Sequence, residues 1–303
     1  MPTLPAPARV ATVTTTPGPD RPPVLLTGAA GRIGRMVRPR LDRLGWEVKP
    51  LDRAPGDDPA VLAIDILDAD ALDAATVGCG AVVHLAGIPG EAPLPDLLRE
   101  NVAGTQAVLD AALRRGIRRV VLASSNHAVG FWTKPAEGVL DVDLRPRPDS
   151  FYGLSKVAAE GLGQLYADRF GLEVVSLRIG SFREEPRSLR ELSTWLSPDD
   201  AARLLDASLR GHVSGHTIVY GTSANSRGWW DLSGARALGY QPQDDAEVFA
   251  DRFAGEAAAR PAPRSGVEPP PAPERVGGPF TSLPLGGSAP FLLGSATPPP
   301  QAS

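Results

Sequence analysis

Tyr152 and Lys156 are the residues in this sequence whose types and spacing most directly suggest chemistry. Side chains four positions apart lie on the same face of a helix, so the phenol and the ammonium group are expected to be neighbours. A nearby positive charge favours the phenolate, which lets a tyrosine take a proton near neutral pH. The pair therefore predicts proton abstraction from an alcohol, although the same spacing also occurs by chance in many helices.

A serine upstream of this pair supplies a third polar group. Ser125 follows the apolar run 120–123, which reads as a buried strand. At the end of that strand its hydroxyl can hold the substrate oxygen while Tyr152, with the charge of Lys156 beside it, removes the proton. Ser124 competes with Ser125 for this role on position alone.

Three glycines near the start of the chain predict a dinucleotide site. Gly28, Gly31 and Gly34 follow the apolar run 24–26 and open a helix-like stretch. Glycines in this context let the backbone turn tightly and approach a pyrophosphate, which then faces the amides of a helix N-terminus. Arg32 and Ile33 lie inside the same loop. The spacing is the form seen in extended short-chain dehydrogenase/reductases.

Asp52 indicates which dinucleotide is bound. It ends the second expected strand and can accept hydrogen bonds from both ribose hydroxyls, whereas a carboxylate there repels a 2′-phosphate. NAD is therefore expected rather than NADP, although Arg53 follows immediately and could contact a phosphate. Further cofactor contacts are expected where later strands end, at Asp65, Ile66, Leu85, Ala86, Gly87 and Ile179.

The elements that must position these residues alternate along the chain. Short apolar strands are expected at 24–26, 46–52, 63–64, 81–85, 120–123 and 173–178. Helices are expected at 33–44, where Pro39 should kink or shorten the helix, at 101–115, and from 151 to 170, where Gly171 ends the helix. This order predicts an α/β fold, a doubly wound Rossmann-type parallel sheet with helices on both faces.

Prolines concentrate at the two ends of the chain and suggest its domain organisation. We expect a disordered extension at 1–22, a single domain at 23–258 and a Pro/Gly-rich tail at 259–303. The alternation fades after about residue 181, so 181–258 is expected to form most of a small substrate lobe. Within the tail, 276–280 looks more like a docking strip than a free linker.

Composition argues against several classes of protein. The net charge is −4 with both signs interspersed, so neither a nucleic-acid surface nor a membrane patch is expected. A single cysteine, Cys79, excludes a disulfide framework, and the only histidines at helical spacing, His212 and His216, lie among glycines, so no metal is expected. Without a long apolar run or a secretory signal, the chain reads as a cytoplasmic enzyme.

Several short motifs together resemble one branch of a known family. They are Ser-Ser-Asn-His-Ala-Val-Gly at 124–130, Arg-Pro-Asp-Ser-Phe-Tyr-Gly-Leu-Ser-Lys at 147–156, Leu-Arg-Ile-Gly-Ser at 177–181, Leu-Ser-Thr-Trp at 192–195 and Trp-Trp-Asp at 229–231. The combination is similar to the uronate dehydrogenases of the NAD-dependent epimerase/dehydratase family, over roughly 22–258. Gly-Gly-Pro-Phe at 277–280 also resembles that branch's C-terminal tail.

The resemblance implies a substrate and assigns residues to it. Such enzymes oxidise the C1 hydroxyl of a hexuronic acid, D-glucuronate or D-galacturonate, to the aldarolactone with NAD as hydride acceptor. Tyr152 would be the base, and the family spacing back from Gly130 favours Ser125 over Ser124. Substrate contacts are implied for Ser125, Asn126, His127, Ser181 and Arg190, with Arg190 as the clamp for the carboxylate.

The resemblance also implies a homo-oligomer, and it leaves two alternatives to weigh. A sugar-nucleotide epimerase or dehydratase would return the hydride and retain NAD, but it needs a larger C-terminal lobe than the residues between Ser181 and the Pro-rich tail provide. A non-catalytic NAD-binding protein on the same fold is disfavoured, because the serine, the tyrosine and the lysine are all present.

Overall fold

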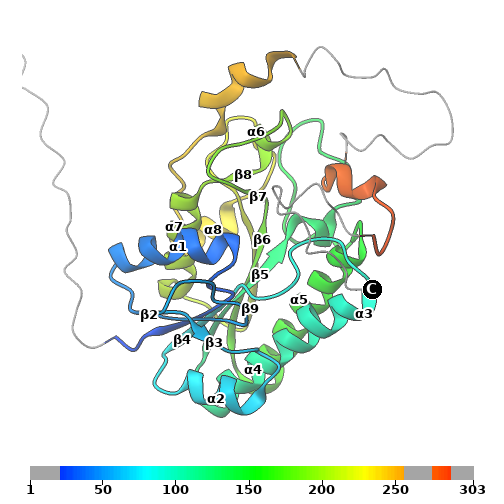
Figure 1. Ribbon diagram of the computed structural model, residues 1–303. Helices are drawn as coiled ribbons and strands as arrows, with labels where there is room; N and C mark the ends of the chain where they lie inside the picture. Colours follow the sequence, from blue (N-terminus) through cyan, green and yellow to red (C-terminus); the bar gives the residue numbers. More distant parts are fainter. Residues whose placement is uncertain (1–20, 256–274, 288–303) are drawn as a thin grey trace, which may run out of the picture.

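Seven parallel strands form the central sheet of the molecule (Figure 1). The computed structural model describes residues 21–255 and 275–287 of the 303. The strand order is β3-β2-β1-β4-β5-β6-β9. The chain adds strands on one side of β1 and then, from β4 on, on the other side, which confirms the predicted doubly wound sheet. The strands are β1 (Val24–Thr27), β2 (Val48–Asp52), β3 (Leu62–Ala63), β4 (Ala81–His84), β5 (Arg119–Ser125), β6 (Glu173–Ile179) and β9 (His216–Gly221).

Helices cover both faces of the sheet, because successive strand residues point to opposite sides. Leu26 packs with Val37 of α1 (Arg32–Arg43) and with residues of α7 (Pro198–Arg210) and α8 (Ser233–Ala237). Leu25, one position earlier, packs with Leu72 on the other face, among residues of α2 (Ala69–Thr76), α4 (Gly104–Arg114) and α5 (Phe151–Phe170). Figure 1 shows these two groups of helices on either side of the sheet.

Local sequence signals explain where α5 begins and ends. The Ser150 hydroxyl accepts a hydrogen bond from Gly153 N at 3.0 Å, and Gly171 ends the helix in the left-handed region with φ of 71°. The predicted bounds of this helix are confirmed.

Two other helix predictions differ from the structure. α1 continues through Pro39 without being shortened, and the Arg40 guanidinium donates to Met36 O at 2.7 Å within the same helix. The helix expected at 101–115 is preceded by a π-helical segment, η1 (Leu98–Ala103), that continues into α4.

The range expected to form the substrate lobe divides between the sheet and the lobe. β9 pairs with β6 along its length, and α7 packs on α1, so both complete the central domain. The smaller elements lie beyond the carboxyl ends of the central strands: β7 (Ser181–Phe182), α6 (Glu191–Thr194), β8 (Trp195–Leu196) and η3 (Ala246–Phe253).

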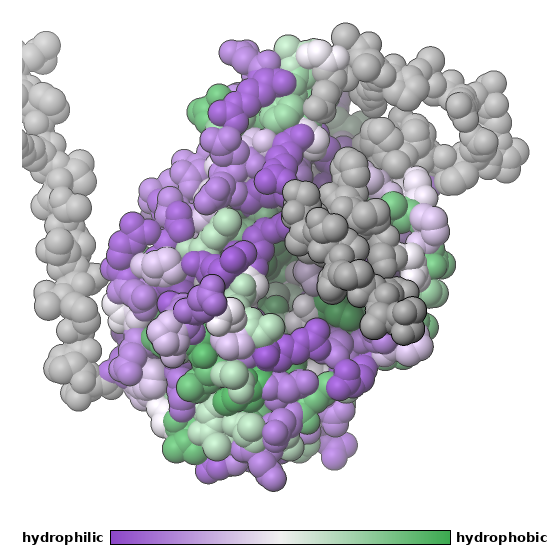
Figure 2. Space-filling view, viewed as in Figure 1, coloured by the Kyte–Doolittle hydropathy of each residue, from purple (hydrophilic) through white to green (hydrophobic). Residues whose placement is uncertain are grey.

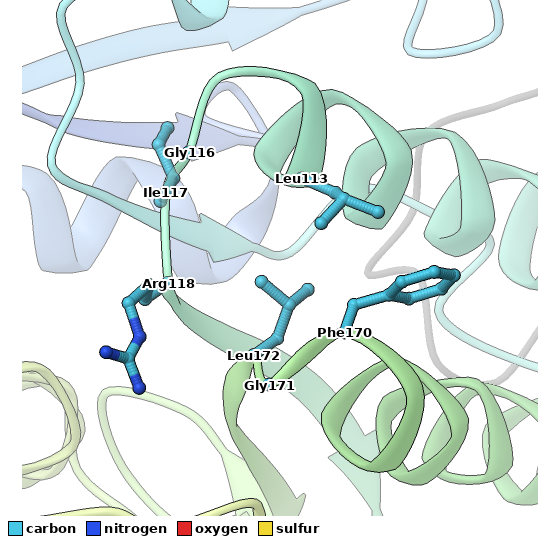
Figure 3. Close-up of a pocket in the computed structure, with 7 residues that line it drawn as sticks. All are labelled: Leu113, Gly116, Ile117, Arg118, Phe170, Gly171 and Leu172. Atoms are coloured by element: carbon cyan, nitrogen blue, oxygen red, sulfur yellow. The ribbon is translucent and has the colours of Figure 1, made fainter.

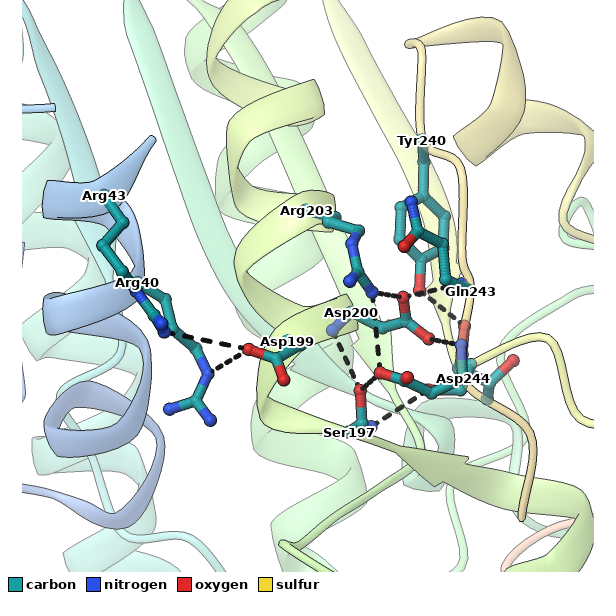
Figure 4. Close-up of polar contacts among 11 residues, drawn as sticks. Arg40, Arg43, Ser197, Asp199, Asp200, Arg203, Tyr240, Gln243 and Asp244 are labelled. Carbon is teal, nitrogen blue, oxygen red and sulfur yellow. Dashed lines mark hydrogen bonds and ion pairs between the residues drawn. The ribbon is translucent and has the colours of Figure 1, made fainter. Parts of the chain in front are cut away.

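A buried carboxylate fastens α7 to the chain that leads into this lobe (Figure 4). Asp200 is fully buried in the first turn of α7 and accepts hydrogen bonds from Gln243 N at 2.9 Å and Asp244 N at 3.0 Å. Arg203 supplies the opposite charge at 2.5 Å. On the exposed side of the same turn, Asp199 pairs with Arg40 of α1 at 2.6 Å.

Residues 275–287, which we call the C-terminal strap, pack against the domain beside α3 (Leu94–Leu97) and the start of α5 (Figure 1). Val276 N donates to Trp132 O and Gly277 N donates to Gly130 O, both at 2.9 Å. η5 (Gly278–Ser282) then brings Phe280 into a cluster with Leu97 and Tyr152. The rest of the two expected tails, at 1–20, 259–274 and 288–303, lies outside the described residues, as do the last residues of the predicted domain, 256–258.

Hydrophilic side chains occupy most of the face shown in Figure 2, with smaller hydrophobic areas in its lower half. Many exposed arginines are paired with carboxylates, such as Arg227 with Glu247 at 2.6 Å and Arg252 with Glu185 at 2.6 Å. Within the described ranges, no helix combines the length and the apolar character that crossing a bilayer requires.

Candidate active site

The glycine loop forms a cradle at the carboxyl end of β1. Gly28 has φ of 71°, and a Cβ built on it would lie 2.6 Å from Ala86 N. A Cβ on Gly34 would lie 2.4 Å from Gly28 O. Only glycine fits at these two positions, because Gly28 lies against the backbone after β4 and Gly34, in α1, lies against the backbone of the glycine loop. The first-turn amides of α1 remain next to this close-packed backbone, which suits a diphosphate.

Asp52 is fixed beside this cradle. One carboxylate oxygen accepts a hydrogen bond from Ala30 N at 3.1 Å, and the other accepts one from Ala54 N at 3.0 Å. Arg53 points elsewhere, because its guanidinium donates to Glu100 at 2.9 Å. The carboxylate is therefore held at the loop, and the adjacent cation is paired with another carboxylate, which suits a ribose with free hydroxyls better than a 2′-phosphate.

Arginines gather at the entrance to α1. Burial lowers the pKa of Arg32, and the positive charges of Arg183 and Arg187 lower it further. Arg183 and Arg187 thus add positive charge beside Arg32 at the helix N-terminus, where Glu191 opposes their effect, and positive charge in this place favours a bound anion. Of the three, only Arg32 was assigned to the cofactor from the sequence, and Arg183 is largely buried in an ion pair with Glu191 at 3.0 Å.

The remaining predicted cofactor residues lie where strands meet loops. Asp65 accepts a hydrogen bond from Leu67 N at 2.9 Å, and Ile66 packs against Gly104. Leu85 N and Ala86 N donate to the backbone oxygen and the hydroxyl of Thr27 at 3.1 and 3.3 Å. Gly87 lies against Asn101, and Ile179 pairs with Ser125 across β5 and β6. Ile33 is the exception, because it lies in the first turn of α1 and packs on the core.

The three predicted catalytic residues meet in one buried place. Burial raises the pKa of Tyr152 to about 12, and a hydrogen bond with Ser125 opposes that shift. Lys156 lies with its ammonium group 5.6 Å from the Tyr152 ring centre and donates to Ala123 O at 2.9 Å. Burial lowers the pKa of Lys156 to about 8, while Glu160 acts to raise it. A phenol, a hydroxyl and a cation are thus assembled for proton transfer.

The structure separates the two adjacent serines. Ser124 donates its hydroxyl to Glu160 at 2.6 Å, inside a buried ion pair between Glu160 and Arg178 at 2.9 Å. Ser125 instead faces Tyr152 and accepts a hydrogen bond from His127 N at 3.2 Å. This arrangement favours Ser125 as the substrate-facing hydroxyl and gives Arg178 a structural place.

His127 lies next to Tyr152 on the substrate side. Its ring contacts the Tyr152 ring edge-on, with centroids 5.8 Å apart, and lies 3.9 Å from the ring of Phe280 in the strap. Its Nδ1 is 2.8 Å from Asp149 Oδ2. The rings of His127, Tyr152 and Phe280 therefore form one aromatic cluster, and the strap packs against the other two through Phe280.

Arg190 lies along the same wall. With the Asn126 amide oriented to satisfy its neighbours, Oδ1 accepts from Arg190 Nη2 at 3.2 Å and Nδ2 donates to Ile179 O at 3.0 Å. Nη2 also donates to Val276 O at 2.6 Å, whereas Nη1 makes a 3.5 Å contact with Thr194 Oγ1. Ser181 joins through a 2.9 Å hydrogen bond to the same Thr194 hydroxyl. Burial lowers the pKa of Arg190, so its charge is poorly solvated and suited to an anionic ligand.

Four contributors to this site were not found from the sequence. Asn101 joins the β4 loop to α5, because it bonds both Ile88 N at 2.7 Å and Ser155 Oγ at 2.9 Å. Glu91 accepts hydrogen bonds from Tyr152 N at 2.9 Å and from Gly286 N at 2.9 Å. The other two are Asp149 and Phe280. Phe280 belongs to the docking strip predicted at 276–280, but its contact with His127 was not predicted. Asp149 lies within the motif at 147–156, so the sequence shows a carboxylate there, but it does not show that the carboxylate contacts His127.

A pocket elsewhere in the molecule is unrelated to this site (Figure 3). It is lined by Leu113, Gly116, Ile117, Arg118, Phe170, Gly171 and Leu172. These residues lie where α4 and α5 end and β5 and β6 begin, at the opposite edge of the sheet from Ser125 and Ile179. Ligands of open α/β sheets bind at the carboxyl edge, so this pocket is not the active site. Among the described residues no group of three or more metal-ligating side chains occurs.

Comparisons with known proteins place the chain in a family. The model of the NAD dependent epimerase/dehydratase family matches residues 24–227, and the chain belongs to this family. It is 42% identical over 232 residues to a uronate dehydrogenase of Pseudomonas syringae pv. tomato, covering 75% of this chain and 83% of the relative.

Solved structures agree with this placement. The crystal structure of uronate dehydrogenase from Agrobacterium tumefaciens is similar with a TM-score of 0.77 and 38% identity, over 88% of this chain and 98% of that chain. A tyrosine-to-alanine variant of the same enzyme, complexed with NAD, matches with a TM-score of 0.77 and 37% identity, over 88% and 99% of the two chains.

Proposed function

We propose that this protein is an NAD-dependent uronate dehydrogenase that oxidises the C1 hydroxyl of a free hexuronic acid to the aldarolactone. The proposal rests on the contacts of two consecutive residues, Asn126 and His127. Asn126 contacts Arg190, and His127 contacts Tyr152. One end of the site therefore offers a cation for a carboxylate, and the other offers a base for a hydroxyl.

Each residue has a defined task in this proposal. Tyr152 takes the proton of the C1 hydroxyl, Ser125 holds the substrate oxygen, and Lys156 keeps a positive charge near the phenol and holds the nicotinamide ribose. NAD, when bound, supplies the hydride acceptor. The cradle at Gly28, Gly31 and Gly34 would hold its diphosphate and Asp52 its adenosine ribose.

The remaining predicted contacts complete the two binding regions. Arg32, Ile33, Asp65, Ile66, Leu85, Ala86, Gly87 and Ile179 border the cofactor region, as described above. We assign Asn126, His127 and Ser181 to sugar hydroxyls and Arg190 to the carboxylate. The relatives named uronate dehydrogenase, and the NAD complex of one of them, support this assignment of activity and cofactor.

A sugar-nucleotide epimerase or dehydratase is the alternative within the same family. The test follows NADH absorbance with purified protein, NAD and D-glucuronate or D-galacturonate, with UDP-glucuronate, D-glucose and D-glucose 6-phosphate in parallel. Rapid NADH formation with the free uronates is the expected result. Conversion of UDP-glucuronate without net NADH would overturn the proposal. Faster oxidation of D-glucose 6-phosphate than of the free uronates would show that the substrate is a different anionic sugar.

We further propose that the enzyme acts in the cytoplasm as a homo-oligomer. In support, α5 carries apolar side chains that are about half exposed in the single chain, Leu154, Leu165 and Phe170. Light scattering coupled to size-exclusion chromatography would give the mass directly. A monomer at micromolar concentration would contradict the proposed assembly without affecting the proposed activity.

A further inference from the structure

His127 is held on several sides, and one ring nitrogen remains for a ligand. Nδ1 is 2.8 Å from Asp149 Oδ2, Phe280 covers one ring face at 3.9 Å between centroids, and Tyr152 lies at the ring edge. No hydrogen bond joins Nε2 to any residue in the described ranges. The nitrogen opposite Asp149 is therefore the atom that can meet a substrate.

The Asp149 carboxylate is fixed by its packing. Its side chain is fully buried, and Oδ1 accepts a hydrogen bond from the Ser150 hydroxyl at 2.8 Å. A Cβ on Gly130 would come within 1.9 Å of Oδ2, and a Cβ on Gly277 within 1.6 Å. The carboxylate fits because both neighbours lack a side chain: Gly130 follows η2 (Asn126–Val129), and Gly277 belongs to the strap.

A carboxylate in this place dictates the state of the imidazole. An ionised carboxylate only accepts hydrogen bonds, so Nδ1 must carry the proton, and in the neutral ring Nε2 is then an acceptor. The charge of Asp149 also reaches the substrate clamp, because it raises the pKa of Arg190 against the effect of burial.

We propose that Asp149 is a positioning residue that holds His127 with its proton on Nδ1, so that Nε2 accepts a hydrogen bond from a hydroxyl of the sugar. The substrate part of this inference rests on the proposed function. The tautomer does not, because it follows from the contact between Asp149 and His127 alone.

The tautomer can be measured without any substrate. Long-range ¹⁵N–¹H correlation spectra distinguish a protonated from a bare ring nitrogen, and His127→Gln assigns the signal among the four histidines. We expect a protonated Nδ1 and a bare Nε2 in the unmodified protein. In Asp149→Asn the amide can donate to Nδ1, so the proton should move to Nε2. A proton on Nε2 in the unmodified protein would overturn the inference, whatever the enzyme's substrate is.

A double-mutant cycle separates positioning from simple packing. Asp149→Asn should raise KM for the uronate about tenfold in the unmodified protein but less than about twofold in His127→Gln, because the two residues act as one unit. KM for NAD should change little. Asp168→Asn, an exposed position at the far end of α5, is the matched control and should change neither.

Equal effects of Asp149→Asn in both backgrounds would show that Asp149 only packs the loop against the strap, and the inference would fall. Thermal melting of each variant accompanies the kinetics. If Asp149→Asn does not fold, the spectrum of the unmodified protein decides the question by itself.

Discussion

At the scale of single residues, the base and its neighbouring cation are tuned in opposite directions by the same burial. The pKa of Tyr152 is raised to about 12 and that of Lys156 is lowered to about 8. The phenol must lose its proton to act, so activity should rise with pH below the pKa of Tyr152. Above about pH 8 Lys156 loses the charge that favours the phenolate, and the rise should flatten.

Substitutions of Lys156 test this coupling. Lys156→Met removes the charge, so the rise of kcat/KM should shift to higher pH. Lys156→Arg keeps a charge at all accessible pH values, so its profile should not flatten near pH 8. Tyr152→Phe should lower kcat by about 10²–10⁴-fold at every pH. Identical profiles for the Met, Arg and unmodified proteins would rule out this role of Lys156.

Arg190 should govern the choice of substrate rather than the chemical step. Its Nη1 has only a 3.5 Å contact with Thr194, so this edge is suited to a carboxylate. Arg190→Ala should raise KM for D-glucuronate by about tenfold or more, because a charge-assisted hydrogen bond is lost. KM for a neutral aldose should change far less. A parallel loss with both sugars would show that Arg190 is not the clamp.

At the scale of elements, the strap packs against residues proposed to bind or position the substrate, namely Asp149, His127 and Arg190. A methyl group on Gly277 would strike Asp149, whereas a methyl group on Gly287 meets nothing nearer than Pro284 O at 3.4 Å. Gly277→Ala should therefore raise KM for the uronate several-fold with little effect on KM for NAD. Gly287→Ala, in the same strap, should behave like the unmodified enzyme. Similar kinetics for both variants would mean that the strap does not shape the pocket.

A buried carboxylate joins α7 to the chain at Gln243 and Asp244. Asp200 is fully buried, accepts two backbone hydrogen bonds and pairs with Arg203, so Asp200→Ala leaves two partly buried backbone donors and one cation without this partner. Urea unfolding should show a loss of about 2–4 kcal/mol. Asp199→Ala removes an exposed pair with Arg40 and should cost about 0–1 kcal/mol. Equal losses would contradict the role given to Asp200.

At the scale of the whole molecule, a buried histidine links stability to pH. His84 lies between the hydroxyls of Thr27 and Thr105, at 2.7 and 3.2 Å, and burial lowers its pKa from 6.5 to about 3. Between these two values the unfolded chain binds a proton that the folded protein does not, so stability falls as the pH drops from 6.5 toward 3.

The size of this effect is measurable by urea unfolding at several pH values. His84 alone should account for a loss of a few kcal/mol, at about 1.4 kcal/mol per unit of pKa difference. His84→Gln should lower stability at neutral pH and flatten its decline in acid. His212→Gln, at an exposed position, should leave the decline unchanged. An equal slope in His84→Gln would exclude His84 as its source.

Local signals in the sequence predicted the sheet, the long helix α5 and the close approach of Tyr152 and Lys156. Alternation, the Ser150 cap, Gly171 and the Tyr152–Lys156 spacing all act over a few residues. Distant contacts were not predictable in this way. Phe280 contacts His127 although 152 positions separate them in the sequence. Asp149 can be recognised as the partner of His127 only in the folded structure, where the two residues meet. Likewise, β9 belongs to the sheet because it pairs with β6, and no local pattern after residue 181 predicted this pairing.

In the proposed reaction, hydride leaves C1 of a free uronate while Tyr152 takes the hydroxyl proton. The most direct measurement uses D-glucuronate deuterated at C1, with mass spectrometry of both the reduced cofactor and the product. We expect the deuterium to appear in the reduced cofactor and to be absent from the lactone, and we expect Tyr152→Phe nearly to abolish the transfer. Deuterium retained in the sugar product while NADH forms would contradict the proposed reaction.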